Sequence, residues 1–157
     1  MFKEFLRTDN SPAQLFIRVA LGVVMFPHGA QKVLGWFGGP GITKTLQAFA
    51  GMGFPAWSAS ALMAVESLGA VLLVFGFLTR LWAIGIGASI TICMFLSHVQ
   101  NGFFMNWLGG QKGEGIEYHI LVLGICLYAF YGGVTFQQLG LTSSDEIFPQ
   151  FIVESLP

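Results

Sequence analysis

Charged residues are scarce in this chain of 157 residues. Asp, Glu, Lys and Arg make up 10% of it, against roughly 25% in a typical soluble domain. The formal net charge is only -1, and no run of Lys or Arg supplies the basic surface that nucleic-acid binding needs. With 54% hydrophobic residues, the composition excludes an ordinary soluble domain and favours a membrane protein.

Cysteine is equally scarce, with Cys93 and Cys126 far apart inside apolar segments. No C-x-x-C or C-x-x-C-H motif is present, which excludes a thioredoxin-like dithiol and a c-type haem attachment. We interpret both cysteines as small buried hydrophobic residues. No flavin or iron–sulfur motif occurs either. Arg18 interrupts the first apolar run, so we expect that run to be a retained span and not a cleaved signal peptide.

Four apolar runs approach the roughly 20 residues that cross a bilayer as a helix. They are continuous and do not alternate with polar residues, and an open sheet edge cannot lie in lipid. The sequence therefore predicts an all-α, integral membrane four-helix bundle that forms one domain over the whole chain. The predicted spans are residues 12–34, 55–78, 81–98 and 116–136, followed by a polar tail over 137–157.

Two longer connections join the spans at the face opposite the termini. In the first, apolar residues Ile42, Leu46 and Phe49 recur at helical spacing opposite Lys44 and Gln47, which predicts a short helix lying in the membrane interface. The second connection is rich in aromatic residues, which favour the headgroup level. An even number of spans places both termini on one side of the membrane.

Orientation follows the distribution of Lys and Arg in short loops. The two sides tie, with three residues on the side of the termini and three on the other: Lys3, Arg7 and Arg80 against Lys32, Lys44 and Lys112. Because Arg80 lies in a minimal hairpin, we expect the termini to be cytoplasmic.

A buried ion pair is predicted between the first two spans. Arg18 begins a stripe of small residues at helical spacing, and Glu66 begins a similar stripe on the second span. Small residues let helix backbones approach closely, and a charge buried at such an interface needs a partner. We expect Arg18 and Glu66 to pair and fix the helix register; alternatively, Glu66 carries protons or faces a ligand.

All three histidines lie at the ends of spans near one membrane face. Ionisable groups inside apolar spans usually face the bundle interior and often mark functional sites. Glu117 and His119 point about 200° apart on an ideal helix, so only one of them should face the bundle axis. The candidate ligand-binding residues are His28, Lys32, Trp36, Glu66, His98, Glu117 and His119.

Three interpretations of this polar site remain. A quinone needs one or two His or Glu partners and an aromatic wall, for which Trp36, Phe103 and Phe104 are candidates. A metal ion requires ligands from several helices, since no H-x-x-x-H or E-x-x-H pair occurs on one helix, and we expect none. In the third interpretation the histidines are satisfied by loops and water.

The order of motifs resembles the DoxX family of small bacterial membrane proteins over nearly the whole chain except the tail. The most specific string is His28-Gly29-Ala30-Gln31-Lys32. It is followed by Gly35-Trp36-Phe37-Gly38-Gly39, Phe49…Met52-Gly53-x-Pro55, Glu66 with Gly69, Gly76…Thr79-Arg80, His98 before Gly102-Phe103-Phe104, and Glu117-Tyr118.

This resemblance implies a four-helix inner-membrane bundle associated with quinone-linked redox chemistry, since the family is named after a subunit of a thiosulfate:quinone oxidoreductase. We therefore expect a redox-associated subunit that handles a quinone and is not a complete enzyme alone. The alternatives are a non-catalytic structural or assembly subunit and a small-solute or proton carrier. Lipid, other membrane or peripheral proteins and a second copy are the expected partners. A longer acidic tail departs from the family pattern and suggests docking to a larger complex.

Overall fold

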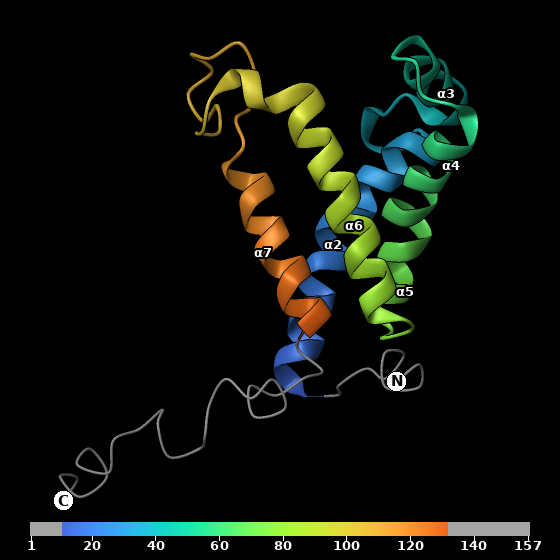
Figure 1. Cartoon of the computed structure of the whole chain (residues 1–157), viewed down its shortest axis with the longest axis vertical. Helices are drawn as coiled ribbons and strands as arrows, with labels where there is room; N and C mark the ends of the chain where they lie inside the picture. The colour runs from blue at the N-terminus through green and yellow to red at the C-terminus, as the bar shows by residue number, and fades with distance from the viewer. Residues whose placement is uncertain (1–10, 132–157) are drawn as a thin grey trace, which may run out of the picture.

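The computed structural model describes residues 11–131, and every regular element in that range is helical. Figure 1 shows long helices running side by side, with the start of α2 and the end of α7 at the same end of the bundle. The elements are α2 (Pro12–Leu34), η1 (Trp36–Gly38), α3 (Gly41–Gly51), α4 (Ala56–Ala64), η2 (Val65–Gly69), α5 (Ala70–Val74), α6 (Thr79–Cys93), η3 (Met94–His98), η4 (Val99–Asn101) and α7 (Glu117–Tyr131).

Within residues 11–131, three continuous helical runs are long and apolar enough to cross a membrane: Pro12–Leu34, Ala56–Val74 and Thr79–Asn101. They match the first three predicted spans, and the all-α membrane bundle is confirmed. The fourth predicted span corresponds to α7, a shorter apolar helix of 15 residues. Its predicted continuation over 132–136 and the polar tail lie outside the described residues.

Helix ends follow local sequence signals. Ser11 caps α2 by accepting a hydrogen bond from the backbone N–H of Gln14 at 3.3 Å, and Pro12 occupies the first helical position, where a missing N–H costs nothing. Gly35 ends the helix in the left-handed conformation at φ 71°, as glycine commonly does. The predicted short helix after this turn is confirmed as α3.

The hairpin between the second and third helical runs comes a few residues earlier than predicted. The second run ends at Val74, and α6 already begins at Thr79. Gly76 and Leu78 adopt positive φ angles of 77° and 53° in the turn. The prediction placed the turn at Thr79-Arg80 because the apolar sequence continues through the turn itself.

Glycine determines how closely α2 approaches the second helical run. A Cβ on Gly22 would collide with the Val74 side chain, and one on Gly29 would lie 2.5 Å from the backbone of Glu66. These contacts confirm that the first two spans pack together along the small-residue stripe of the first span. Gly69, from the second stripe, instead faces α6, where a Cβ would lie 2.6 Å from the Trp82 ring.

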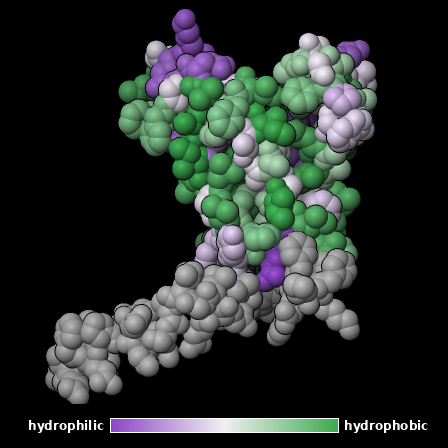
Figure 2. Space-filling model, in the orientation of Figure 1, coloured by the Kyte–Doolittle hydropathy of each residue, from purple (hydrophilic) through white to green (hydrophobic). Residues whose placement is uncertain are grey.

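Apolar side chains fill the interior and also cover the outside. The buried core comprises Leu21, Met25, Ala70, Leu73, Ile86, Ile90, Val122 and Cys126. Large apolar side chains such as Phe16, Trp57 and Phe75 are exposed, an arrangement typical of a lipid-facing surface. Figure 2 shows this apolar surface over the middle of the helices, with hydrophilic side chains at the end that carries α3 and the α6–α7 connection.

Candidate functional site

A cavity of about 520 Å³ lies at the end of the bundle where the histidines gather. Ligand pockets usually have volumes of roughly 300–1,000 Å³. Five of the seven predicted candidates line it, namely His28, Lys32, Glu66, His98 and His119. The other lining residues are Val24, Met25, Ile90, Cys93, Met105, Glu114 and Tyr118.

Two short π-helices shape this cavity. Val65–Gly69 carries Glu66, and Met94–His98 ends at His98. A π-helix makes i→i+5 hydrogen bonds and often occurs at functional sites as a single turn within an α-helix. The wider turn after Cys93 brings the side chain of His98 back over it: Cys93 Sγ lies 3.8 Å from His98 Nδ1.

Glu66 is the best-buried charge at the cavity. Its carboxylate forms an ion pair with the Lys32 ammonium and accepts a hydrogen bond from the Ser89 hydroxyl. The Glu66 side chain is 3% exposed, whereas the Lys32 side chain is 26% exposed. Glu66 Oε2 contacts the Lys32 ammonium, and Glu66 Oε1 accepts the hydrogen bond from Ser89. The negative charge of Glu66 is therefore balanced by a lysine on α2.

The predicted ion pair between Arg18 and Glu66 is wrong. Gly29 packs directly against the Glu66 backbone, and Arg18 lies 11 positions earlier on α2. At ~1.5 Å per residue, this places Arg18 about 16 Å from the depth of Glu66. Lys32 lies about one turn beyond Gly29 and is the cation that reaches the Glu66 carboxylate. Within residues 11–131, Arg18 is 5% exposed and its Nε and Nη1 atoms have no hydrogen-bond partner.

The histidines occupy different positions in the cavity. His28 is exposed and His98 is half-buried, while His119 is only 4% exposed. The rings of His98 and His119 approach to 4.3 Å between centroids. Buried polar atoms normally have hydrogen-bond partners, yet His119 Nδ1 and the Tyr118 hydroxyl are buried with none in the described part of the chain.

Two predicted candidates lie outside the cavity lining. Trp36 is exposed and contacts Phe37 edge-on. Glu117 accepts a hydrogen bond from the Trp107 indole N–H at 3.3 Å. The prediction that only one of Glu117 and His119 faces the bundle interior agrees with the structure, because His119 is buried and Glu117 is half-buried.

The predicted aromatic wall is also wrong. Phe103 and Phe104 contact each other edge-to-face, with ring centroids 5.1 Å apart. Both are exposed, and neither lines the cavity. Its apolar walls come instead from the spans, mainly Met25 and Ile90, both buried. A quinone site needs an aromatic wall, for which these interfacial loop residues were candidates, but neither of them reaches the cavity lining.

Sequence reasoning missed Cys93, Tyr118, Ser89 and Met105. The sequence pattern predicts Cys93 to be a buried hydrophobic residue, whereas it is half-buried and lines the cavity. Its five-residue spacing from His98 was the available signal, but that spacing has no meaning on an ideal α-helix. Tyr118 adjoins two residues already selected and was the easiest of the four to find.

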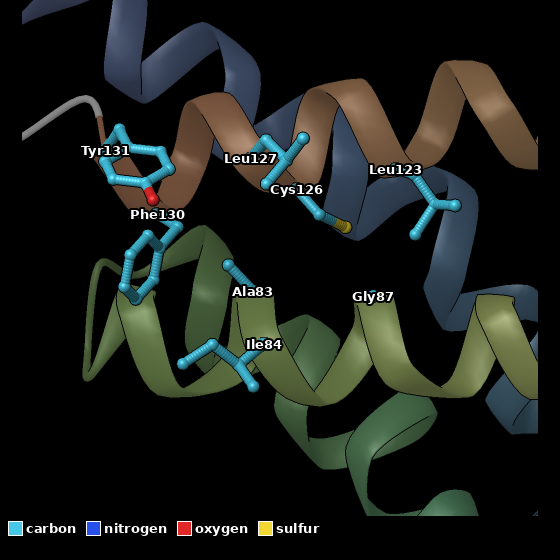
Figure 3. A pocket seen from close by; sticks show the side chains of 8 residues that line it. All are labelled: Ala83, Ile84, Gly87, Leu123, Cys126, Leu127, Phe130 and Tyr131. Carbon is cyan, nitrogen blue, oxygen red and sulfur yellow. The ribbon is translucent and has the colours of Figure 1, made fainter.

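A second hollow lies between α6 and α7 and differs in chemistry. It has a volume of about 280 Å³, and Figure 3 shows that apolar side chains dominate its lining, with Cys126 among them. Its lining residues are Ala83, Ile84, Gly87, Leu123, Cys126, Leu127, Phe130 and Tyr131. No ionisable group other than the Cys126 thiol and the Tyr131 phenol lines it, so the polar chemistry belongs to the larger cavity.

Comparison with known proteins assigns the family. The DoxX family matches residues 13–99, which include most of the cavity-lining residues. The chain belongs to the DoxX family. Together with the three apolar helical runs, this membership makes it a multi-pass membrane protein.

One relative carries a functional description. The Bacillus subtilis (strain 168) protein named "Putative oxidoreductase CatD" is 39% identical over 83 residues, which cover 50% of this chain and 58% of the relative. The matched region thus spans less than two thirds of that relative's length. No solved structure matches the chain.

Proposed function

We propose that this DoxX-family protein is a redox-associated membrane subunit that binds a quinone or quinone-like ring in the 520 Å³ cavity. The observation that carries the proposal is the convergence of polar groups from distant segments on one apolar-walled space. Glu66 and Lys32 meet there with three histidines and Tyr118. Ligand sites typically combine such apolar walls with a few convergent polar groups.

The polar groups match the needs of a quinone ring. Its two carbonyl oxygens accept hydrogen bonds, and the Lys32 ammonium, the Tyr118 hydroxyl and the histidine N–H groups are donors. The Tyr118 hydroxyl and His119 Nδ1 have no protein partner among the described residues. A ligand that bonds to them would remove the cost of leaving buried polar groups unsatisfied, which is about 1–3 kcal/mol each.

Proton transfer would follow from the same arrangement. Reduction of a quinone to a quinol takes up two electrons and two protons at the carbonyl oxygens. Histidine and carboxylate side chains within hydrogen-bond reach are suitable proton donors and acceptors, and His28 is exposed at the cavity. Because the sequence has no flavin, haem or iron–sulfur motif, the electrons would come from a partner protein or a bound small molecule.

The curated relative supports a redox function and gives no substrate for it. Its printed name describes an oxidoreductase, and the family match covers the α2, η2 and α6 contributions to the cavity. We also propose a bacterial inner-membrane location, which is supported by the family membership. The cytoplasmic side of the termini is supported by the loop charges alone.

Equilibrium binding of menadione to the purified protein in detergent tests the proposal. We expect saturable binding that weakens roughly tenfold or more in Lys32→Met and Tyr118→Phe, because each variant loses a hydrogen-bond donor at the cavity. Glu117→Gln is the matched control, since Glu117 lies in the same region but not on the cavity. Non-saturable partitioning that is equal in all variants would contradict the proposal.

A structural or assembly subunit is the alternative that the Lys32–Glu66 ion pair favours. In that case the pair holds α2 against the second helical run and binds nothing. Loss of stability in the cavity variants, without any menadione binding by the wild type, would support it. The carrier hypothesis loses its original support, because Arg18 and Glu66 do not share one depth of the bundle.

A further inference from the structure

We propose that Cys93, His98 and His119 form a binding site for a thiophilic transition-metal ion of the zinc or copper type. One potential donor atom from each of these residues lies within 4.8 Å of the other two. A thiolate and two imidazoles form a donor set that suits these ions. Nothing in the menadione proposal requires this site, so either can fail alone.

The spacing of the three side chains is close to that of a bound site. With metal bonds of ~2.3 Å to sulfur and ~2.1 Å to nitrogen, two tetrahedral ligand atoms lie about 3.6 Å apart. The 4.8 Å limit therefore leaves roughly 1 Å to be closed by side-chain rotation. The helices α6 and α7, which carry Cys93 and His119, already pack against each other.

The hydrogen bonds leave ring nitrogens suited to a metal. His98 Nδ1 lies 3.2 Å from the Cys93 carbonyl oxygen. This same nitrogen lies 3.8 Å from Cys93 Sγ. In the tautomer that carries the proton on Nε2, the lone pair of Nδ1 is available to a metal ion beside the thiolate. His119 is 4% exposed, and its Nδ1 has no hydrogen-bond partner within residues 11–131.

The π-helix explains why α-helical periodicity does not predict the site. The expectation of no metal rested on the lack of a ligand pair on one helix. The π-turn Met94–His98 makes Cys93 and His98 such a pair, because it brings residues five positions apart to the same face of the helix. Three protein ligands leave a fourth coordination position, as in catalytic zinc sites. All three residues line the cavity, so this position is accessible to a small molecule there.

Metal binding to the purified full-length protein, with any affinity tag removed, tests the inference. Zn²⁺ and Cu⁺ are titrated in separate arms against a competing chelator, and bound metal is counted by mass spectrometry. We expect one ion per chain and a loss of affinity of roughly 100-fold or more in Cys93→Ser and His119→Gln, beyond the 10–100-fold typical of second-shell changes. The two arms show which of these ions the site binds.

Two matched controls lie within the same chain. Cys126→Ser changes the other buried cysteine, which belongs to the apolar hollow, and His28→Gln changes a cavity histidine outside the cluster. Both should keep wild-type affinity. Equal loss in Cys93→Ser and Cys126→Ser, or wild-type stoichiometry below about 0.1 in both arms, would overturn the proposal.

Cobalt provides a readout that does not depend on the variants folding. Co²⁺ bound to wild-type protein should show a thiolate-to-metal charge-transfer band and the visible absorption of a tetrahedral site. The band should persist in Cys126→Ser. Co²⁺ bound without a charge-transfer band would exclude the Cys93 thiolate as a ligand and refute the site.

Discussion

Replacing Lys32 with methionine removes the charge opposite Glu66 but keeps most of the length of the side chain. Losing one partner of a buried ion pair usually costs roughly 3–5 kcal/mol. The Glu66 side chain is 3% exposed, but Lys32 is 26% exposed, and Ser89 keeps its hydrogen bond to the carboxylate. We therefore expect Lys32→Met to lower the free energy of unfolding by about 2–3 kcal/mol, a fall in Tm of about 5–10 °C for this chain length.

The assay is thermal and denaturant unfolding in detergent micelles, followed by circular dichroism. Lys44→Met is the matched control, because Lys44 is exposed on α3 and should change stability by no more than about 0.5 kcal/mol. The double variant Lys32→Met/Glu66→Met should recover most of the loss, since apolar replacement of a buried pair is often neutral or stabilising. If Lys32→Met were as stable as Lys44→Met, the ion pair would contribute nothing and the reasoning would be refuted.

Three further predictions concern the packing of the helices and the membrane topology. Gly29→Ala should destabilise by about 1–3 kcal/mol, because its Cβ would meet the Glu66 backbone, whereas Gly124→Ala meets nothing within 4 Å; equal unfolding midpoints would contradict this. A double-mutant cycle of Arg18→Gln with Glu66→Gln should give a coupling energy below about 0.5 kcal/mol, and a coupling above 2 kcal/mol would restore the original pairing. Cysteines introduced at positions 3 and 145 in a Cys93→Ser/Cys126→Ser background should react with an impermeant label from the same membrane side, and labelling from opposite sides would refute the predicted topology.

Much of the fold could be predicted because hydrophobic length and helix-end signals are local. The stripe that contains Gly22 and Gly29 indicated which face of the first span packs against the second. Register could not be predicted, because it depends on which residues of two helices meet. The two possible partners of Glu66 on α2, Arg18 and Lys32, lie about four turns apart. That is why Arg18 was chosen over Lys32.

The candidate site was predicted by its residues better than by its geometry. His28, His98 and His119 were selected because each ends a span at the same face, and the structure brings all three to one cavity. The role of Cys93 could not be predicted from α-helical periodicity, since a π-turn changes which residues share a face. The path of the α6–α7 connection, which removes Phe103 from the cavity, depends on tertiary contacts that no local pattern encodes.

Photo-crosslinking with an azido-quinone in membrane vesicles tests the central claim most directly. After irradiation, peptide mass spectrometry locates the adducts. We expect them on cavity-lining residues of α2, α6 and α7, such as Met25, Ile90 and Tyr118, and we expect excess menadione to abolish them. Adducts only on lipid-facing residues such as Phe16 or Trp57, unaffected by menadione, would contradict a quinone site in this cavity.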